Sequence, residues 1–288
     1  MPKHTQTHLS GVFRPRLLPT GRAVSGGGYD PDAIIFFGVT GLTDVPQKDA
    51  LNALVVGLKA QGLWTKMNAI YPMLGGTAGT HAVNLRSPGT YNLTFSGGIT
   101  HSSTGALWNG TTGYGDSGLV PTSVLTNNST HLSYYSRTAN TTNTYDIGVF
   151  STANDHAMYL GCYYSFGGNA AFSGAYDGSV GLDVAALTPA QNTDSSGFYV
   201  GSRDGTAYHV LAKNGSLGTV VTTKSAFGDM TAIINSVIVG GVSRLGSMFL
   251  YSNRECAFAS IGAGLSAANI TAFNTLVQDY QTALGRQV

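Results

Sequence analysis

The 288-residue sequence predicts a mostly β fold, an antiparallel β-sandwich with one helix near the N-terminus and one at the C-terminus. Beyond residue 76, short runs of alternating apolar and polar residues recur about every ten residues, the spacing typical of sandwich strands. The 39 glycines supply the tight turns that many short strands require. Helical periodicity is confined to two segments, so alternating β-α units are not indicated.

The two predicted helices carry their own start and stop signals. The first covers residues 45–61, where apolar side chains recur on one face and Gly62 follows at the C-terminal position. The second covers residues 266–285, with Ser266 as its N-cap and an apolar stripe along one side. A short apolar run at residues 33–37 fits either a buried strand or the start of a helix.

These patterns divide the chain into three parts. Residues 1–30 show neither helical nor strand periodicity and are expected to form an extended arm. Residues 31–75 form a helical lead-in packed on the sandwich. Residues 76–288 form the sandwich domain, which the C-terminal helix closes.

The charge balance excludes two classes of partner. A net charge of +1 provides no field that would hold a nucleic acid or an anionic membrane. No apolar stretch approaches the ~20 residues that span a bilayer, and the basic N-terminal residues lead into no apolar signal segment.

Charged residues make up only 10% of the chain, so its surface is rich in neutral amides and hydroxyls. Such a surface suits subunit packing and the recognition of uncharged partners such as sugars.

The arm is basic, with no acidic residue before Asp30. One interpretation is a disordered tail. The other is a peptide that becomes ordered against a neighbouring subunit and anchors the protein there. The anchoring residues would be Lys3, Arg14, Arg16 and Arg22.

Metal and disulfide signals are weak. Cys162 and Cys256 lie far apart on apolar stretches and are expected to be two buried free thiols, with a disulfide as the alternative. None of the seven histidines pairs at a metal-ligand spacing. Asp204, Asn214 and Asp229 could supply oxygen ligands for Ca²⁺, but this signal is nonspecific, and no cofactor is predicted.

The catalytic inventory is also poor. Glycosidases on this type of sandwich need two closely spaced carboxylates, and the single glutamate, Glu255, has no acidic residue near it in the sequence. Because Arg254 precedes it, Glu255 is expected to be a salt-bridged structural residue. No Gly-x-Ser-x-Gly nucleophile motif is present. We therefore expect a protein that is not an enzyme; a polysaccharide depolymerase is the alternative.

A binding site is easier to find in the segment 97–118, which is dense in glycine, serine, threonine and asparagine. Aromatic rings stack on the apolar faces of sugars, while amide, carboxylate and imidazole groups bind hydroxyls. The alternative is a packed loop whose tryptophan belongs to the core. The candidate ligand-binding residues are His101, Trp108, Asn109, Tyr114 and Asp116.

Several stretches resemble known modules. Residues 58–88 (LKAQGLWTKMNAIYPMLGGTAGTHAVNLRSP) and 93–121 (LTFSGGITHSSTGALWNGTTGYGDSGLVP) resemble a module of tailed-bacteriophage virion proteins. Residues 197–218 (GFYVGSRDGTAYHVLAKNGSLG) look like the strand–hairpin–strand of concanavalin/laminin-G-like sandwiches. Residues 254–286 resemble the last strand and terminal helix of the phage modules. Together the resemblance covers residues 31–286.

The resemblance implies a jelly-roll sandwich on a phage particle, made in the host cytoplasm. The subunit would belong to a tail fibre, tail tip, head fibre or capsid decoration. Its implied partners are other virion proteins, copies of itself (phage appendages are often trimers) and a glycan of the host surface. Since no coiled-coil heptads or collagen-like repeats are present, a compact adaptor or decoration subunit fits better than a whole fibre.

Overall fold

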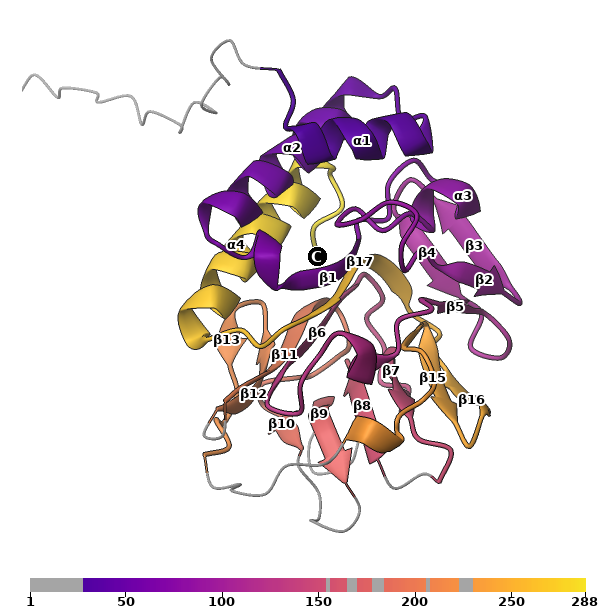
Figure 1. Ribbon diagram of the computed structural model, residues 1–288, viewed down its shortest axis with the longest axis vertical. Coiled ribbons are helices and arrows are strands. Elements are labelled where there is room, and N and C mark those ends of the chain that lie inside the picture. Colours follow the sequence, from indigo (N-terminus) through magenta and orange to yellow (C-terminus); the bar gives the residue numbers. More distant parts are fainter. Residues whose placement is uncertain (1–27, 154–155, 165–169, 178–183, 206–207, 223–229) are drawn as a thin grey trace, which may run out of the picture.

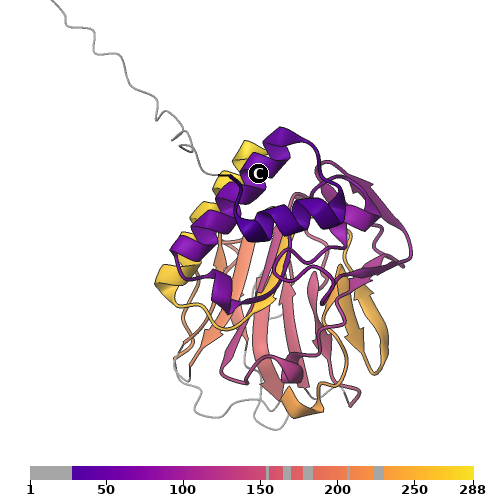
Figure 2. The same ribbon diagram turned by 45° about the horizontal axis from the view of Figure 1, so that its top comes forward.

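The computed structural model describes residues 28–153, 156–164, 170–177, 184–205, 208–222 and 230–288. Here two largely antiparallel sheets face each other, and helices cover the outer side of one of them (Figures 1 and 2). The predicted β-sandwich with an N-terminal and a C-terminal helix is confirmed. Among the described residues, no helix has the length and apolar character needed to cross a bilayer. The predicted arm residues Lys3, Arg14, Arg16 and Arg22 lie outside the described residues.

The first sheet has the order β13-β12-β11-β6-β17-β4-β3, and β1 pairs with β17. Its strands are β1 (Met67–Tyr71), β3 (Ile99–Ser102), β4 (Gly105–Trp108), β6 (Ser129–Ser136), β11 (Gly197–Asp204), β12 (His209–Lys213), β13 (Ser216–Leu217) and β17 (Glu255–Gly262). The strand–hairpin–strand arrangement expected for residues 197–218 is present, with a tight turn between β12 and β13. Asn214 and Gly215 both have positive φ, 49° and 77°, as a two-residue type I′ turn requires.

The second sheet has the order β10-β9-β8-β7-β14-β5-β2, with β15 and β16 attached as a side branch. Its strands are β2 (Thr94–Ser96), β5 (Tyr114–Asp116), β7 (Ile147–Phe150), β8 (His156–Gly161), β9 (Ala170–Asp177), β10 (Ala185–Leu187), β14 (Ile238–Val239), β15 (Gly241–Arg244) and β16 (Ser247–Tyr251). The branch arises because one edge of β7 serves two partners. Ile147 and Gly148 pair with β14, whereas Val149 pairs with β15.

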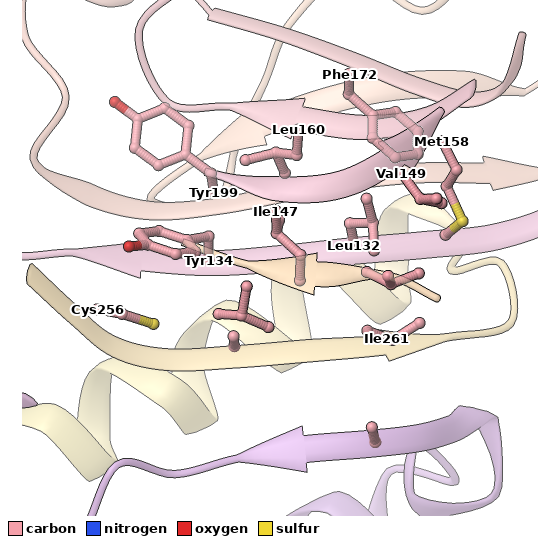
Figure 3. Packing of buried hydrophobic residues seen from close by; sticks show 14 of the residues in the cluster. Leu132, Tyr134, Ile147, Val149, Met158, Leu160, Phe172, Tyr199, Cys256 and Ile261 are labelled. Atoms are coloured by element: carbon pink, nitrogen blue, oxygen red, sulfur yellow. The ribbon is translucent and has the colours of Figure 1, made fainter. Parts of the chain in front are cut away.

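The core between the sheets follows the two-residue period of the strands. In β6, Leu132 and Tyr134 face this core, while Tyr135 points to the opposite side, toward the helices. Figure 3 shows Leu132 and Tyr134 opposite side chains of the second sheet, among them Ile147 and Phe172. The alternation predicted from the sequence therefore places one face of each central strand in the sandwich core.

The helices are α1 (Pro31–Thr40), α2 (Val45–Ala60), α3 (Ala78–His81) and α4 (Ala267–Ala283), with 3₁₀ turns η1 (Trp64–Lys66), η2 (Pro121–Ser123) and η3 (Met230–Ala232). Residues 33–37 belong to α1, which decides between the two structures that the sequence left open. Asp30 caps this helix and Pro31 is its first residue, a position where proline costs no hydrogen bond.

The helical layer packs through its predicted apolar faces. In α4, Ile270, Phe273, Val277 and Tyr280 are buried, and the Ser266 side chain accepts a hydrogen bond from the Asn269 backbone, as the predicted N-cap should. Beyond the helix, the buried guanidinium of Arg286 donates to the carbonyls of Pro72, Met73 and Ala257. These bonds tie the segment after α4 to the first sheet.

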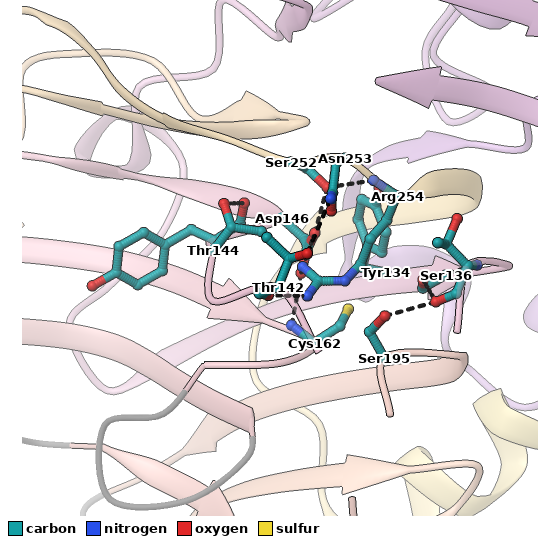
Figure 4. Close-up of polar contacts among 12 residues, drawn as sticks. Tyr134, Ser136, Thr142, Thr144, Asp146, Cys162, Ser195, Ser252, Asn253 and Arg254 are labelled. Carbon is teal, nitrogen blue, oxygen red and sulfur yellow. Dashed lines mark hydrogen bonds and ion pairs between the residues drawn. The ribbon is translucent and has the colours of Figure 1, made fainter. Parts of the chain in front are cut away.

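A buried ion pair joins the two sheets. Asp146 directly precedes β7 of the second sheet, and Arg254 directly precedes β17 of the first; both side chains are fully buried. Arg254 Nη1 lies 2.9 Å and 3.0 Å from the two oxygens of Asp146, and Ser252 Oγ donates to the same carboxylate at 2.6 Å (Figure 4). The Cys162 backbone N–H donates to it as well, at 2.7 Å. The carboxylate is therefore surrounded by donors, which offset its loss of hydration.

The two cysteines flank this pair. Both are free and buried, so the predicted pair of free thiols is confirmed. Burial raises the pKa of Cys162, and the Asp146 carboxylate raises it further, so the thiol stays protonated.

Replacing Arg254 with methionine is expected to lower the free energy of unfolding by about 3–5 kcal/mol, because Asp146 would keep a buried charge without its cation. Denaturation in guanidinium chloride measures the change. Arg137→Met is the control, since its ion pair with Glu255 is partly exposed, and such pairs contribute about 0–1 kcal/mol. A loss for Arg254→Met no larger than for the control would contradict a structural role for the buried pair.

Candidate functional site

The branch point of the second sheet, which we call the fork, lies at Gly240. This residue follows β14 and precedes β15, and both of its backbone polar groups are bonded: its N–H donates to Asp146 O at 2.8 Å, and its carbonyl accepts from Ser252 N at 2.9 Å. Its φ is +91°, and a Cβ atom there would lie 2.5 Å from the Trp108 ring. Only glycine meets both demands, so the chain can reverse here against the core.

A pocket of about 190 Å³ opens between the two branches of the fork. Tyr114 and Asp116 of β5 form one wall, and the β15–β16 hairpin forms the other. The hairpin wall includes Ser243 and Met248, and the Tyr114 ring approaches that of Tyr251 on β16 to 6.3 Å between centroids. The remaining lining residues are Asn235, Ser236, Ile238, Gly246 and Ser247.

The polar groups of the pocket are only partly satisfied. Asp116 Oδ1 accepts hydrogen bonds from Gly118 N at 2.9 Å and from the Ser236 hydroxyl, which fixes the orientation of the carboxylate. Asn235 Nδ2 and Ser243 Oγ are covered, yet neither has a hydrogen-bond partner among the residues that the structure describes. An unpaired buried donor costs about 1–3 kcal/mol, so a ligand that paired with these atoms after a small side-chain rotation would regain that energy.

Trp108 does not belong to this pocket. Its side chain is 1% exposed, and its indole N–H donates to the Tyr134 hydroxyl at 2.8 Å within the sandwich core. The ring therefore cannot stack on a sugar, and the alternative reading of the loop holds for this residue. The misassignment arose because a tryptophan at the end of a short strand gives the same sequence signal whether its ring faces inward or outward.

His101 and Asn109 also lie elsewhere. The His101 ring is in contact with that of His81, with 3.0 Å between their Nδ1 atoms; burial lowers the pKa of both, to about 3 for His81, so both are neutral at pH 7. The Asn109 side chain accepts from the backbone N–H groups of Thr111, Thr112 and Gly113, all at 2.9–3.0 Å. It therefore shapes its own loop. Of the five predicted ligand-binding residues, the pocket brings together Tyr114 and Asp116.

The other polar residues considered have structural partners. Glu255 is salt-bridged as predicted, but its partner is Arg137, 2.8 Å away, while the neighbouring Arg254 pairs with Asp146. Asn214 Oδ1 accepts from Phe198 N at 2.8 Å and supports the hairpin turn. Asp229 lies outside the described residues. Within the part that the structure describes, no cluster of three or more His, Cys, Asp or Glu side chains could hold a metal ion.

Sequence reasoning missed the second half of the pocket. Asn235, Ser243 and Met248 come from a segment more than a hundred residues after Tyr114, and the sequence does not show that β5 and β14 are neighbours. One signal was present: the pair Gly240–Gly241 interrupts two strand-like runs, which marks a sharp turn or bulge in a strand region.

Comparisons with known proteins bear on the fold. No protein-family model and no curated protein matches the sequence. A solved structure from work on botulinum neurotoxin type C, whose cell entry is described as dependent on interaction with two ganglioside molecules, superposes with a TM-score of 0.51. It is 12% identical and covers 75% of this chain; the chain spans about half, 53%, of that structure.

Two other solved structures superpose with lower TM-scores. Domain 4 of an extracellular arabinanase from Geobacillus stearothermophilus, in complex with arabinotriose, has a TM-score of 0.43 at 18% identity, covering 72% of this chain and 98% of that one. A Trypanosoma rangeli sialidase mutant has a TM-score of 0.41 at 11% identity, covering 82% of this chain and 40% of that one. At these identities the likeness to the neurotoxin structure establishes the sandwich fold alone.

Proposed function

We propose that the chain is a non-enzymatic adhesion module that binds a host-surface glycan in the fork pocket. The observation that carries the proposal is the pocket itself. It combines a tyrosine ring, an oriented carboxylate and two polar atoms that have no partner within the described ranges, all in one cleft. Convergent polar groups beside an apolar surface are what sugar recognition requires. The ganglioside interaction described for the neurotoxin supports glycan binding by a sandwich of this fold, but gangliosides carry acidic sugars, so it does not bear on the class of sugar bound in the fork pocket.

The engagement of Glu255 supports a non-enzymatic role. One of its carboxylate oxygens accepts from the Thr104 hydroxyl and the other binds Arg137. A general acid or nucleophile in a glycosidase must meet the scissile bond with a second carboxylate nearby. A glutamate with both oxygens bound to protein groups is poorly suited to act as a general acid or as a nucleophile.

The phage particle is the setting that we propose for this adhesion. The resemblance of residues 31–286 to virion modules supports it, and so does the low fraction of charged residues. Helix α1 follows the basic arm directly and leaves Ile34, Ile35 and Val39 more than half exposed. An exposed apolar helix face suits contact with another subunit of the particle.

Asp116→Asn is expected to weaken glycan binding about tenfold or more, because a neutral amide accepts a weaker hydrogen bond than a carboxylate. Glycan-array binding followed by titration of the best glycan measures the effect. Asp279→Asn, at an exposed position on α4, is the control and should bind as the parent does. Equal binding by Asp116→Asn and the parent would remove the fork pocket as the site.

Deletion of residues 1–28 is expected to leave the sandwich folded but to abolish incorporation into phage particles. Circular dichroism of the purified variant reports on the fold, and quantitative mass spectrometry of particles complemented with it reports on incorporation. The full-length chain expressed in the same way is the control. Truncated protein present in particles at the parental copy number would refute anchoring by the arm.

A further inference from the structure

The charge of the fork pocket bears on the class of glycan. Of the described residues that line it, Asp116 alone carries a charge at pH 7; the others are serines, glycine, asparagine, tyrosine and two apolar residues. Proteins bind carboxylate ligands with arginine, lysine or clustered backbone N–H groups, which neutralise the charge as it leaves water. The described wall of this pocket offers no cation for that purpose.

Arg244 is the basic residue nearest to the lining residues in the sequence, but its side chain contacts other groups. Arg244 follows the lining residue Ser243, but its guanidinium lies over the ring of Phe249, 4.5 Å from the centroid. Its charge also acts on Tyr145, a member of the aromatic cluster beside β7. Because successive strand residues point to opposite faces, Ser243 faces the pocket and Arg244 faces away from it.

The free oxygen of Asp116 favours a hydroxyl donor. Oδ1 is occupied by Gly118 and Ser236, whereas Oδ2 accepts no hydrogen bond from the described residues. A sugar hydroxyl can donate to Oδ2 while the neighbouring hydroxyl accepts from Asn235 Nδ2, which has no partner in the described part of the chain. A ligand carboxylate at the same place would meet a like charge at close range in a partly desolvated cleft.

The pocket has room for about one sugar unit. Its volume of about 190 Å³ lies below the roughly 300–1,000 Å³ of sites that enclose drug-sized molecules. Met248 and the Tyr114 ring provide a small apolar part of a lining that is otherwise mostly polar, so hydrogen bonds to hydroxyls would account for most of the recognition.

We propose that the fork pocket binds an uncharged sugar residue and discriminates against the corresponding acidic sugar. This inference rests on the proposed glycan-binding function. The discrimination arises from the Asp116 carboxylate, whose free oxygen accepts from a sugar hydroxyl and repels a carboxylate.

The test uses the full chain and matched ligands. The probes are the methyl glycosides of glucose, galactose and mannose, each paired with its hexuronic acid counterpart, in which C6 is a carboxylate. Ligand-observed NMR titration gives the dissociation constants. For at least one pair we expect the neutral sugar to bind about tenfold or more tightly than the acid. In Asp116→Asn, the neutral sugar should bind more weakly, and its dissociation constant should lie closer to that of the corresponding uronic acid.

Arg244→Gln is the matched control, because it removes the adjacent cation without touching the pocket wall; the preference should be unchanged. If the uronic acids bound as tightly as the neutral sugars or more tightly, the inference would be overturned. Loss of the preference for the neutral sugar in Arg244→Gln would overturn it too. Either result would leave the proposed glycan binding at the site in place. If the parent chain bound neither the six probes nor any glycan on the array, both the proposed glycan-binding function and the inferred preference would be wrong.

Discussion

The ion pair between Asp146 and Arg254 is the interaction on which the architecture depends. It connects the segments that lead into β7 and β17, one in each sheet, at a depth where neither side chain reaches solvent. The same carboxylate receives the Ser252 hydroxyl, and the backbone of Asp146 and Ser252 holds Gly240 from both sides. A buried charge that needs all these donors tolerates few alternative arrangements, so the pair fixes how the two sheets meet.

The functional site follows from this constraint. Because Gly240 is held at the end of β14, the chain must reverse, and β15 leaves the sheet as a separate branch with β16. The space between the branches is the fork pocket, where two polar atoms, Asn235 Nδ2 and Ser243 Oγ, find no hydrogen-bond partner among the described residues. The hydrogen bonds that hold Gly240 thus both fix the fork and create the pocket beside it. A pre-formed cleft of this kind binds without a large ordering cost.

Periodic and local features were predictable from the sequence, and long-range ones were not. The helices, the Ser266 cap and the Asn214–Gly215 turn depend on neighbours in the chain, so their signals are local. The sequence indicated that Glu255 is paired, but not that its partner is Arg137, which lies far away in the chain. Trp108 was misassigned because its orientation depends on Tyr134 and Gly240, which only the tertiary fold brings to it. Tyr114 and Asp116 were found, but the second wall of their pocket depends on the pairing of β5 with β14.

The most direct measurement of the central claim is a crystal structure of the chain soaked with its preferred neutral sugar. We expect one sugar ring in the fork pocket, over Tyr114, with Asp116, Asn235 and Ser243 within hydrogen-bond distance and the Asp146–Arg254 pair unchanged. A sugar bound at another face of the sandwich, with the fork pocket filled only by water, would contradict it.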